Sequence, residues 1–147
     1  MGQIDLPKFL KDHKKIVVDT MVFIYQFEAH PKFSPLTHRI FVSLEEQKNQ
    51  GFLSTISLME VLVKPKRERN YPLVLKYQNL LNRSPWLKII DVTQEVADLA
   101  AGVRAKYNLG SADSLVVATG LSCGATGLIT ADKKMSVVKE IKTFILK

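Results

Sequence analysis

Short runs of β-branched residues alternate along the chain with longer amphipathic segments, and this alternation constrains the fold more than any other feature of the sequence. Such a pattern is typical of βα units, in which successive strands are parallel and helices cover the sheet. The runs predicted as strands are residues 16–18, 52–56, 86–90, 127–130 and 143–146. We therefore expect an α/β protein, a three-layer α/β/α sandwich with a mostly parallel sheet of about five strands.

Apolar residues recur at helical spacing between these strands. The predicted helices cover residues 20–27, 36–50, 71–82 and 112–122, with further helices after Ser57 and after Thr93, the latter carrying Val96, Leu99, Ala100, Val103 and Tyr107 on one face. Gly51 is expected to end the second helix, and Ser57, Thr93 and Ser111 are expected to be N-caps. Glu60 follows Ser57 at the spacing of a capping box. The Pro- and Lys/Arg-rich stretch 64–70 is predicted to be a loop.

Composition limits the classes of protein that fit. A length of 147 residues predicts one domain over residues 1–147. No apolar run approaches the roughly 18 residues that cross a bilayer, and the N-terminus lacks the apolar segment of a signal peptide. The single cysteine, Cys123, excludes an internal disulfide framework and favours a reducing, cytoplasmic location.

The net charge of +7, with a pI near 9.5, favours a polyanionic partner such as a nucleic acid. The alternative is a basic protein without such a partner.

Four carboxylates lie in apolar surroundings where an ionised side chain is costly to bury without compensation. Asp19 follows Ile16-Val17-Val18, and Asp132 closes Leu128-Ile129-Thr130-Ala131-Asp132. Glu60 and Asp113 are expected in the first turns of helices. In an open parallel sheet these positions face one crevice, at the carboxyl ends of the strands, where ligands bind. Oxygen ligands of this kind suit Mg²⁺ or Mn²⁺ better than zinc or copper.

Each acid also has a simpler interpretation. Glu60 and Asp113 could stabilise helix N-termini, Asp19 could be an N-cap, and Asp132 could begin a turn. Four such residues at one predicted sheet edge are harder to explain in this way. Asp91 also follows a strand, but an ordinary polar helix start comes after it, so we interpret it as a turn residue.

These motifs, taken in order, resemble the PIN-domain family, and within it the VapC-type toxins. The family begins with an apolar strand, Asp-Thr or Asp-Ser, and an apolar helix, as in residues 16–24. Its Glu after the second strand matches Glu60, and its Asp-small-apolar-apolar-Ala-Thr-Ala pattern matches residues 113–119, with Gly120 in place of the final Ala. Its Thr-x-Asp matches Thr130-Ala131-Asp132. The resemblance extends from Ile16 to about Met135.

The resemblance implies the strand order 3-2-1-4-5 and a metal-dependent ribonuclease that leaves a 5′-phosphate and a 3′-hydroxyl. One or two Mg²⁺ or Mn²⁺ ions would lower the pKa of a water molecule and stabilise charge on the phosphate. Asp19 and Asp113 would be direct ligands, Glu60 would bind metal or orient water, and Asp132 would be an outer or second-site ligand. Thr20 and Thr130 would hydrogen-bond these carboxylates or a metal-bound water.

The resemblance also implies partners: RNA as substrate, an antitoxin protein, and a second copy in a homodimer. Six cations near the acidic motifs are candidates for gripping RNA phosphates, and a solvated basic surface is the alternative. They are Lys64, Lys66, Arg67, Arg69, Lys133 and Lys134.

Other enzyme classes fit less well. A haloacid-dehalogenase-like phosphatase needs a second Asp at the position of Met21, and a receiver domain needs an acidic pair near Asp19. No glycine-rich phosphate loop is present. Two alternatives stay open: a catalytically idle PIN scaffold that binds RNA or a protein partner, and an RNA-processing nuclease outside toxin–antitoxin systems.

Overall fold

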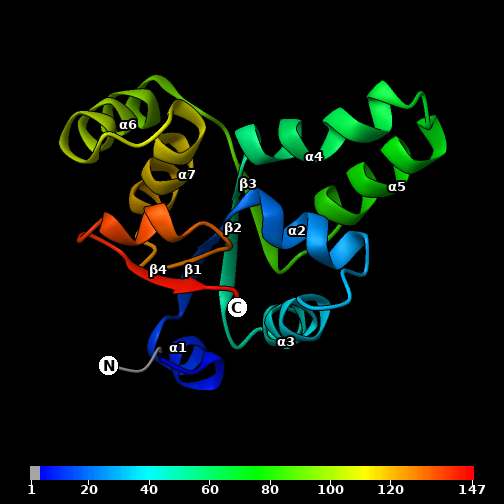
Figure 1. Ribbon diagram of the computed structural model, residues 1–147, viewed down its shortest axis with the longest axis horizontal. Helices are drawn as coiled ribbons and strands as arrows, with labels where there is room; N and C mark the ends of the chain where they lie inside the picture. Colours follow the sequence, from blue (N-terminus) through cyan, green and yellow to red (C-terminus); the bar gives the residue numbers. More distant parts are fainter. Residues whose placement is uncertain (1–3) are drawn as a thin grey trace.

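A computed structural model describes residues 4–147, and within that range one five-stranded sheet forms the centre of the molecule (Figure 1). The strands are β1 (Lys15–Val18), β2 (Gln50–Ser54), β3 (Leu87–Ile90), β4 (Gly127–Thr130) and β5 (Lys142–Ile145). Their order is β3-β2-β1-β4-β5, and every neighbouring pair is parallel. The predicted parallel sheet and the strand order implied by the resemblance are confirmed.

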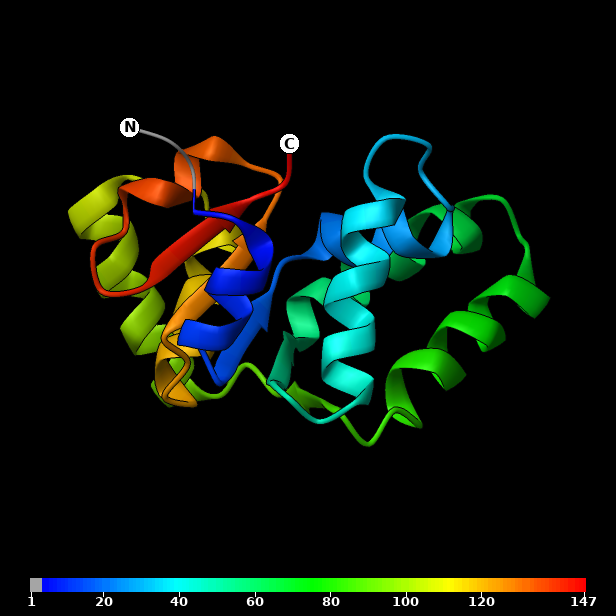
Figure 2. The same ribbon diagram turned by 90° about the horizontal axis from the view of Figure 1, so that it is seen from below.

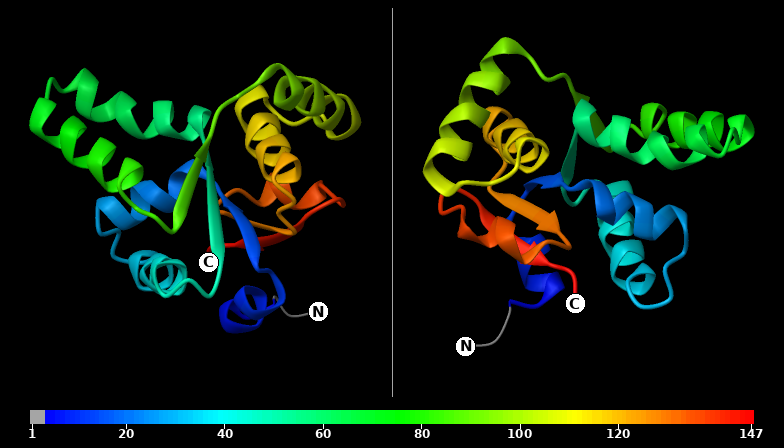
Figure 3. Two further views of the ribbon diagram at one scale, coloured as in Figure 1. Left: turned by 180° about the vertical axis from the view of Figure 1, so that it is seen from behind. Right: turned by 45° about the horizontal axis from the view of Figure 1, so that its top comes forward.

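Helices cover both faces of the sheet, which confirms the three-layer sandwich (Figures 2 and 3). One face carries α1 (Leu6–Asp12), α2 (Thr20–Phe27), α3 (Ser34–Glu45), α4 (Thr55–Arg67) and α5 (Tyr71–Asn82). The other carries α6 (Gln94–Tyr107), α7 (Ser111–Ser122) and the 3₁₀ turn η1 (Lys133–Val137). No helix within residues 4–147 has the length and apolar character needed to span a membrane.

The central strand is buried on both sides, as expected for a parallel sheet between helices. Successive side chains of a strand point to opposite faces. Ile16 and Val18 accordingly pack with α1–α5, whereas Val17 packs against α7 and η1. All three residues are 0% exposed. β1 therefore contributes side chains to the cores on both faces of the sheet, and Asp19 follows it at the carboxyl edge.

The predicted boundary between the second helix and the second strand is wrong. The helix was expected over 36–50, but α3 ends at Glu45 and the chain reverses at Gln47, whose φ is 58°. Gly51 does not stop a helix, because it lies within β2. A Cβ at Gly51 would lie 3.1 Å from the methyl groups of Leu44, so glycine lets α3 pack closely on the strand.

The start and end of α4 also differ from prediction. Ser54, the last residue of β2, is the N-cap, and its side chain accepts a hydrogen bond from Ile56 N. Ser57 is a buried helical residue and not the cap. Glu60 consequently lies in the second turn and not the first. The predicted loop 64–70 is helical as far as Arg67, and Pro65 lies inside α4.

The N-cap of α7 and the helix α1 also differ from prediction. Gly110, and not Ser111, is the N-cap of α7, and Ser111 is the first helical residue. The helix α1 was not anticipated. Gly120, which departs from the family pattern, has a steric reason: a Cβ there would lie 2.6 Å from Val17 Cγ1. Glycine thus allows α7 to approach the central strand.

Candidate functional site

Asp19 occupies the carboxyl end of the central strand and is held from two sides. Its backbone N–H donates to Ile129 O of β4 at 2.9 Å. Its Oδ1 accepts from Thr20 N at 2.8 Å as the N-cap of α2, and its Oδ2 accepts from Thr130 Oγ1 at 2.7 Å. With 8% of its surface exposed, the carboxylate is fixed and almost removed from water. The N-cap interpretation of Asp19 is therefore correct, but the second oxygen is held by a different strand, which a cap does not require.

Glu60 is linked to Asp19 through Thr20. Thr20 Oγ1 donates to Glu60 Oε1 at 2.7 Å and lies 2.8 Å from Ser57 Oγ. A hydroxyl has one proton, so Thr20 donates either to Glu60 or to Ser57 at any moment, and not to both. Ser57 was predicted as a cap and its part in this chain of hydroxyls was missed. Its spacing from Glu60, one helical turn, was the available signal.

Asp113 and Asp132 approach the same edge from the other face. Asp113 lies in the first turn of α7 and is half-buried. Asp132 follows β4, and its backbone N–H donates to Thr130 Oγ1 at 3.0 Å. Its Oδ1 accepts from Lys134 N at 2.9 Å and caps η1, so the turn interpretation holds for that oxygen. Thr130 Oγ1 therefore links the Asp19 carboxylate to the backbone of Asp132.

The pKa values show that the four acids share one electrostatic environment. The pKa of Asp19 is raised from 3.8 to about 6, mainly by burial and also by repulsion from Asp113 and Glu60, against the hydrogen bonds from Thr130 and Thr20, which lower it. Burial also raises the pKa of Asp113, followed by repulsion from Asp132 and Glu60. Lys134 lowers the pKa of Asp113. A cation placed among these carboxylates would relieve both the repulsion and the desolvation.

The donor set has the chemistry of a hard-cation site, because it contains only oxygen ligands. Within residues 4–147, however, no three His, Cys, Asp or Glu side chains are grouped so that they could hold a metal ion as they stand. Carboxylates repel one another when no cation lies between them, and the side chains of Glu60 and Asp113 are half-buried. The residues fit the chemistry of a divalent ion, and their role as ligands stays a prediction.

Asp91 differs from these acids. It directly follows β3, an outer strand of the sheet, and it is exposed. Asp91 does not contribute to the raised pKa of Asp19 or to that of Asp113. It is the matched control for a strand-end acid outside the site.

The helix α4 determines on which of its faces the candidate RNA-binding cations Lys64, Lys66 and Arg67 lie. Residues three or four apart share a helix face, so Lys64 and Arg67 extend from the face that carries Glu60. Lys64 Nζ is already paired with Glu28 Oε1 at 3.2 Å. All six candidates are exposed: Lys64, Lys66, Arg67, Arg69, Lys133 and Lys134.

Comparison with known families and structures gives a consistent result. A family model described as PIN domain matches residues 16–141. No curated protein matches the chain. Among solved structures, VapBC2 from Rickettsia felis, bound to a DNA fragment from its promoter, has a TM-score of 0.73 at 16% identity and covers 90% of this chain and 99% of that one.

Two further structures have the same fold. A toxin–antitoxin complex from Klebsiella pneumoniae has a TM-score of 0.69 at 23% identity, covering 89% of this chain and 99% of that one. VapC20 from Mycobacterium tuberculosis, described as a sarcin-ricin loop cleaving toxin, has a TM-score of 0.69 at 16% identity, covering 86% of this chain and 98% of that one. At these identities the likeness shows the fold.

Proposed function

This chain belongs to the PIN-domain family, and from that premise we propose that it is a Mg²⁺- or Mn²⁺-dependent endoribonuclease that acts as the toxin of a toxin–antitoxin pair. The observation that carries the proposal is Asp19. This carboxylate is buried at the carboxyl end of the central strand, and its pKa is raised to about 6 by burial and by two neighbouring acids. Such a group is costly in a structural role and is useful as a ligand to a cation.

In such a site the side chains would have different roles. Asp19 and Asp113 would hold the ion from opposite faces of the sheet, with Asp132 beside them. Thr130 and Thr20 hold the two Asp19 oxygens through a hydroxyl and a backbone N–H, which fixes the direction in which its free lone pairs point.

Glu60, which accepts a hydrogen bond from Thr20, would bind the ion or orient the attacking water. A bound divalent ion would supply positive charge that lowers the pKa of water and stabilises charge on the phosphate.

RNA as the substrate is supported by three observations. The net charge of +7 favours a polyanion. Exposed cations lie on the same face of α4 as Glu60, towards the C-terminus of the helix, and in η1 directly after Asp132. VapC20, which has this fold, is described as a sarcin-ricin loop cleaving toxin.

The test uses one labelled sequence as single-stranded RNA, as single-stranded DNA and as circular RNA, each with Mn²⁺, Mg²⁺ or EDTA. We expect cleavage of linear and circular RNA with either metal, giving a 5′-phosphate and a 3′-hydroxyl, and none with EDTA. Cleavage that persists in EDTA would overturn the metal requirement. Preference for DNA would overturn the substrate, and cleavage of neither polymer would favour the idle scaffold.

An antitoxin partner is supported by the fold likeness to structures described as toxin–antitoxin complexes. We expect the product of a small neighbouring gene to co-purify with this chain and to inhibit RNA cleavage. Cleavage that the purified neighbour leaves unchanged would instead favour an RNA-processing role. The homodimer stays a prediction, which sedimentation velocity of the purified chain tests directly.

A further inference from the structure

The helix α1 lies outside the segment 16–141 that matches the family model, yet it is firmly built into the fold. Leu6 and Phe9 are buried in the core with α2–α5. Asn49, which is 5% exposed, donates from Nδ2 to Leu10 O at 2.7 Å and to His13 O at 2.6 Å. A buried side chain that satisfies two backbone carbonyls fixes the end of α1 against the start of β2. α1 is therefore an ordered addition to the segment that matches the family model.

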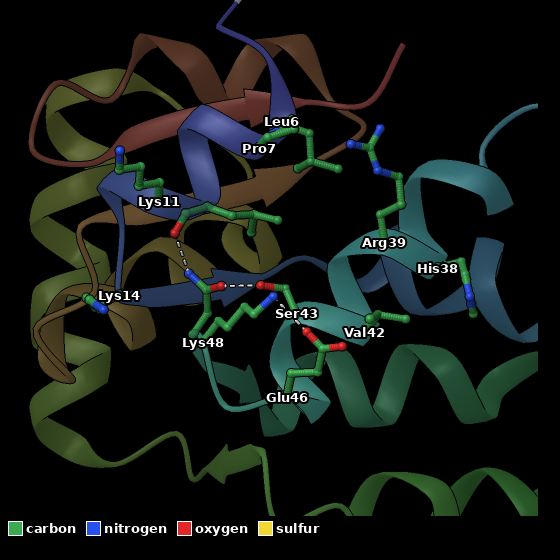
Figure 4. A pocket seen from close by; sticks show the side chains of 12 residues that line it. Leu6, Pro7, Lys11, Lys14, His38, Arg39, Val42, Ser43, Glu46 and Lys48 are labelled. Atoms are coloured by element: carbon green, nitrogen blue, oxygen red, sulfur yellow. Dashed lines mark hydrogen bonds and ion pairs between the residues drawn. The ribbon is translucent and has the colours of Figure 1, made fainter.

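This addition forms one wall of a pocket whose other wall is α3 (Figure 4). The pocket has a volume of about 660 Å³, within the range of ligand sites. Its apolar surface comes from Leu6, Pro7 and Leu10 of α1 and from Val42 of α3. Lys14 and Asn49, which also line it, precede β1 and β2. The pocket thus lies at the amino ends of the strands, opposite the carboxyl edge that carries the acids.

The rim of the pocket is strongly basic. Lys11, Lys14, Arg39 and Lys48 line it together with a single acid, Glu46. Glu46 Oε2 is paired with Lys48 Nζ at 2.8 Å. Within residues 4–147, no ion pair involves Lys11, Lys14 or Arg39. Figure 4 shows Lys11 on the α1 side and Arg39 on the α3 side of the apolar floor.

We propose that this groove between α1 and α3 docks a short acidic segment of a partner polypeptide, with an apolar side chain on the floor and carboxylates on the rim. The apolar floor favours an apolar group, which the sugar-phosphate backbone lacks, and no Phe, Tyr or Trp lines the groove to stack a base. A second copy of this chain, with a net charge of +7, would bring further positive charge to a positive rim. An acidic peptide with an apolar anchor satisfies both the floor and the rim.

The probe is a library of displayed 12-residue peptides selected on the wild-type protein, followed by synthesis of the enriched peptide and measurement of its Kd by fluorescence anisotropy. We expect enriched sequences with net negative charge and at least one Leu, Ile, Val or Phe. The double variant Lys11→Glu/Arg39→Glu should bind the peptide on the order of tenfold more weakly or worse, because two favourable charge contacts become repulsive. Val42→Asp should also weaken binding.

The matched control reverses two exposed cations elsewhere, Lys76→Glu/Lys139→Glu, and should keep wild-type affinity. Lys11 and Arg39 are exposed, so their variants are expected to fold, and RNA cleavage by the double variant should equal wild type. Enrichment of neutral or basic peptides, or equal affinity in the double variant, would overturn the proposal. Loss of RNA affinity or of a dimer in that variant, with peptide binding unchanged, would assign the groove to RNA or to a second copy.

Discussion

Replacing Asp19 with Asn should make the metal-free protein more stable, and the gain should depend on pH. The pKa of Asp19 is about 6 in the fold, against its ordinary value of 3.8, mainly because the side chain is buried. A group whose pKa is raised by folding contributes stability while it is protonated. That contribution is complete below about pH 4 and is lost as the pH rises through about 6.

The size of the effect follows from the same shift. A change of that size corresponds to roughly 3 kcal/mol against the ionised form in the fold. Asn keeps an oxygen for Thr20 N but cannot offer a second carboxylate oxygen to the Thr130 hydroxyl, which removes about 1 kcal/mol. The net gain for Asp19→Asn near neutral pH is therefore about 1–2 kcal/mol, or roughly 2–8 °C in Tm.

The assay is urea unfolding in EDTA at about pH 4.5 and about pH 7.5, with Asp91→Asn as the exposed strand-end control. The advantage of Asp19→Asn over wild type should be larger at the higher pH, and Asp91→Asn should show no such difference. Saturating Mn²⁺ should reverse the order, because the ion stabilises only a fold that binds it. An Asn variant whose advantage does not grow with pH would refute the assignment of Asp19 as an uncompensated buried charge.

Three further predictions test other parts of the site. Asp113→Asn should diminish the rise in Tm that Mn²⁺ causes, and an unchanged rise would remove Asp113 from the site. Replacing Lys66, Arg67 and Arg69 with Gln should weaken RNA binding and flatten its salt dependence by roughly one unit of slope per lost phosphate contact; wild-type binding at every salt concentration would make this a solvated surface. Thr20→Val should lower kcat roughly 10- to 100-fold at little cost in RNA affinity, since Glu60 loses its hydrogen bond, and Thr20→Ser should restore it. Wild-type kcat in Thr20→Val would show that the link is only structural.

The fold was largely predictable because local patterns and tertiary packing agree in this chain. The helices 20–27 and 71–82 and the strand 127–130 have the predicted bounds, since each is enclosed by a cap, a proline or a glycine. The α3–β2 boundary failed for a tertiary reason. A glycine after a helical pattern predicts the end of the helix. Gly51 instead lies within β2, where a side chain would crowd Leu44 of α3. Packing of this kind leaves no signal in the neighbouring residues.

The placement of the four acids at one edge of the sheet was predictable from the sequence, but the hydrogen bonds around them were not. Strand-end placement and apolar flanks indicated the four acids, and the parallel sheet brings them to one edge. The hydroxyl of Ser57 was misassigned because Ser54 and Ser57 both precede apolar helical residues, and spacing alone does not tell which one caps α4. The helix α1 was missed because seven residues with one proline give little periodicity, although Asp5 caps it.

The most direct test of the central claim is the single-turnover rate of RNA cleavage by Asp19→Asn, measured with saturating protein and Mn²⁺ beside wild type and Asp91→Asn. Removing one charged element of a preorganised site commonly costs on the order of 10²–10³ in rate. We predict a loss of that size or more for Asp19→Asn, with the protein folded and still bound to RNA, and a rate close to wild type for Asp91→Asn. Normal cleavage by Asp19→Asn, or loss of cleavage in Asp91→Asn, would contradict the assignment of the site.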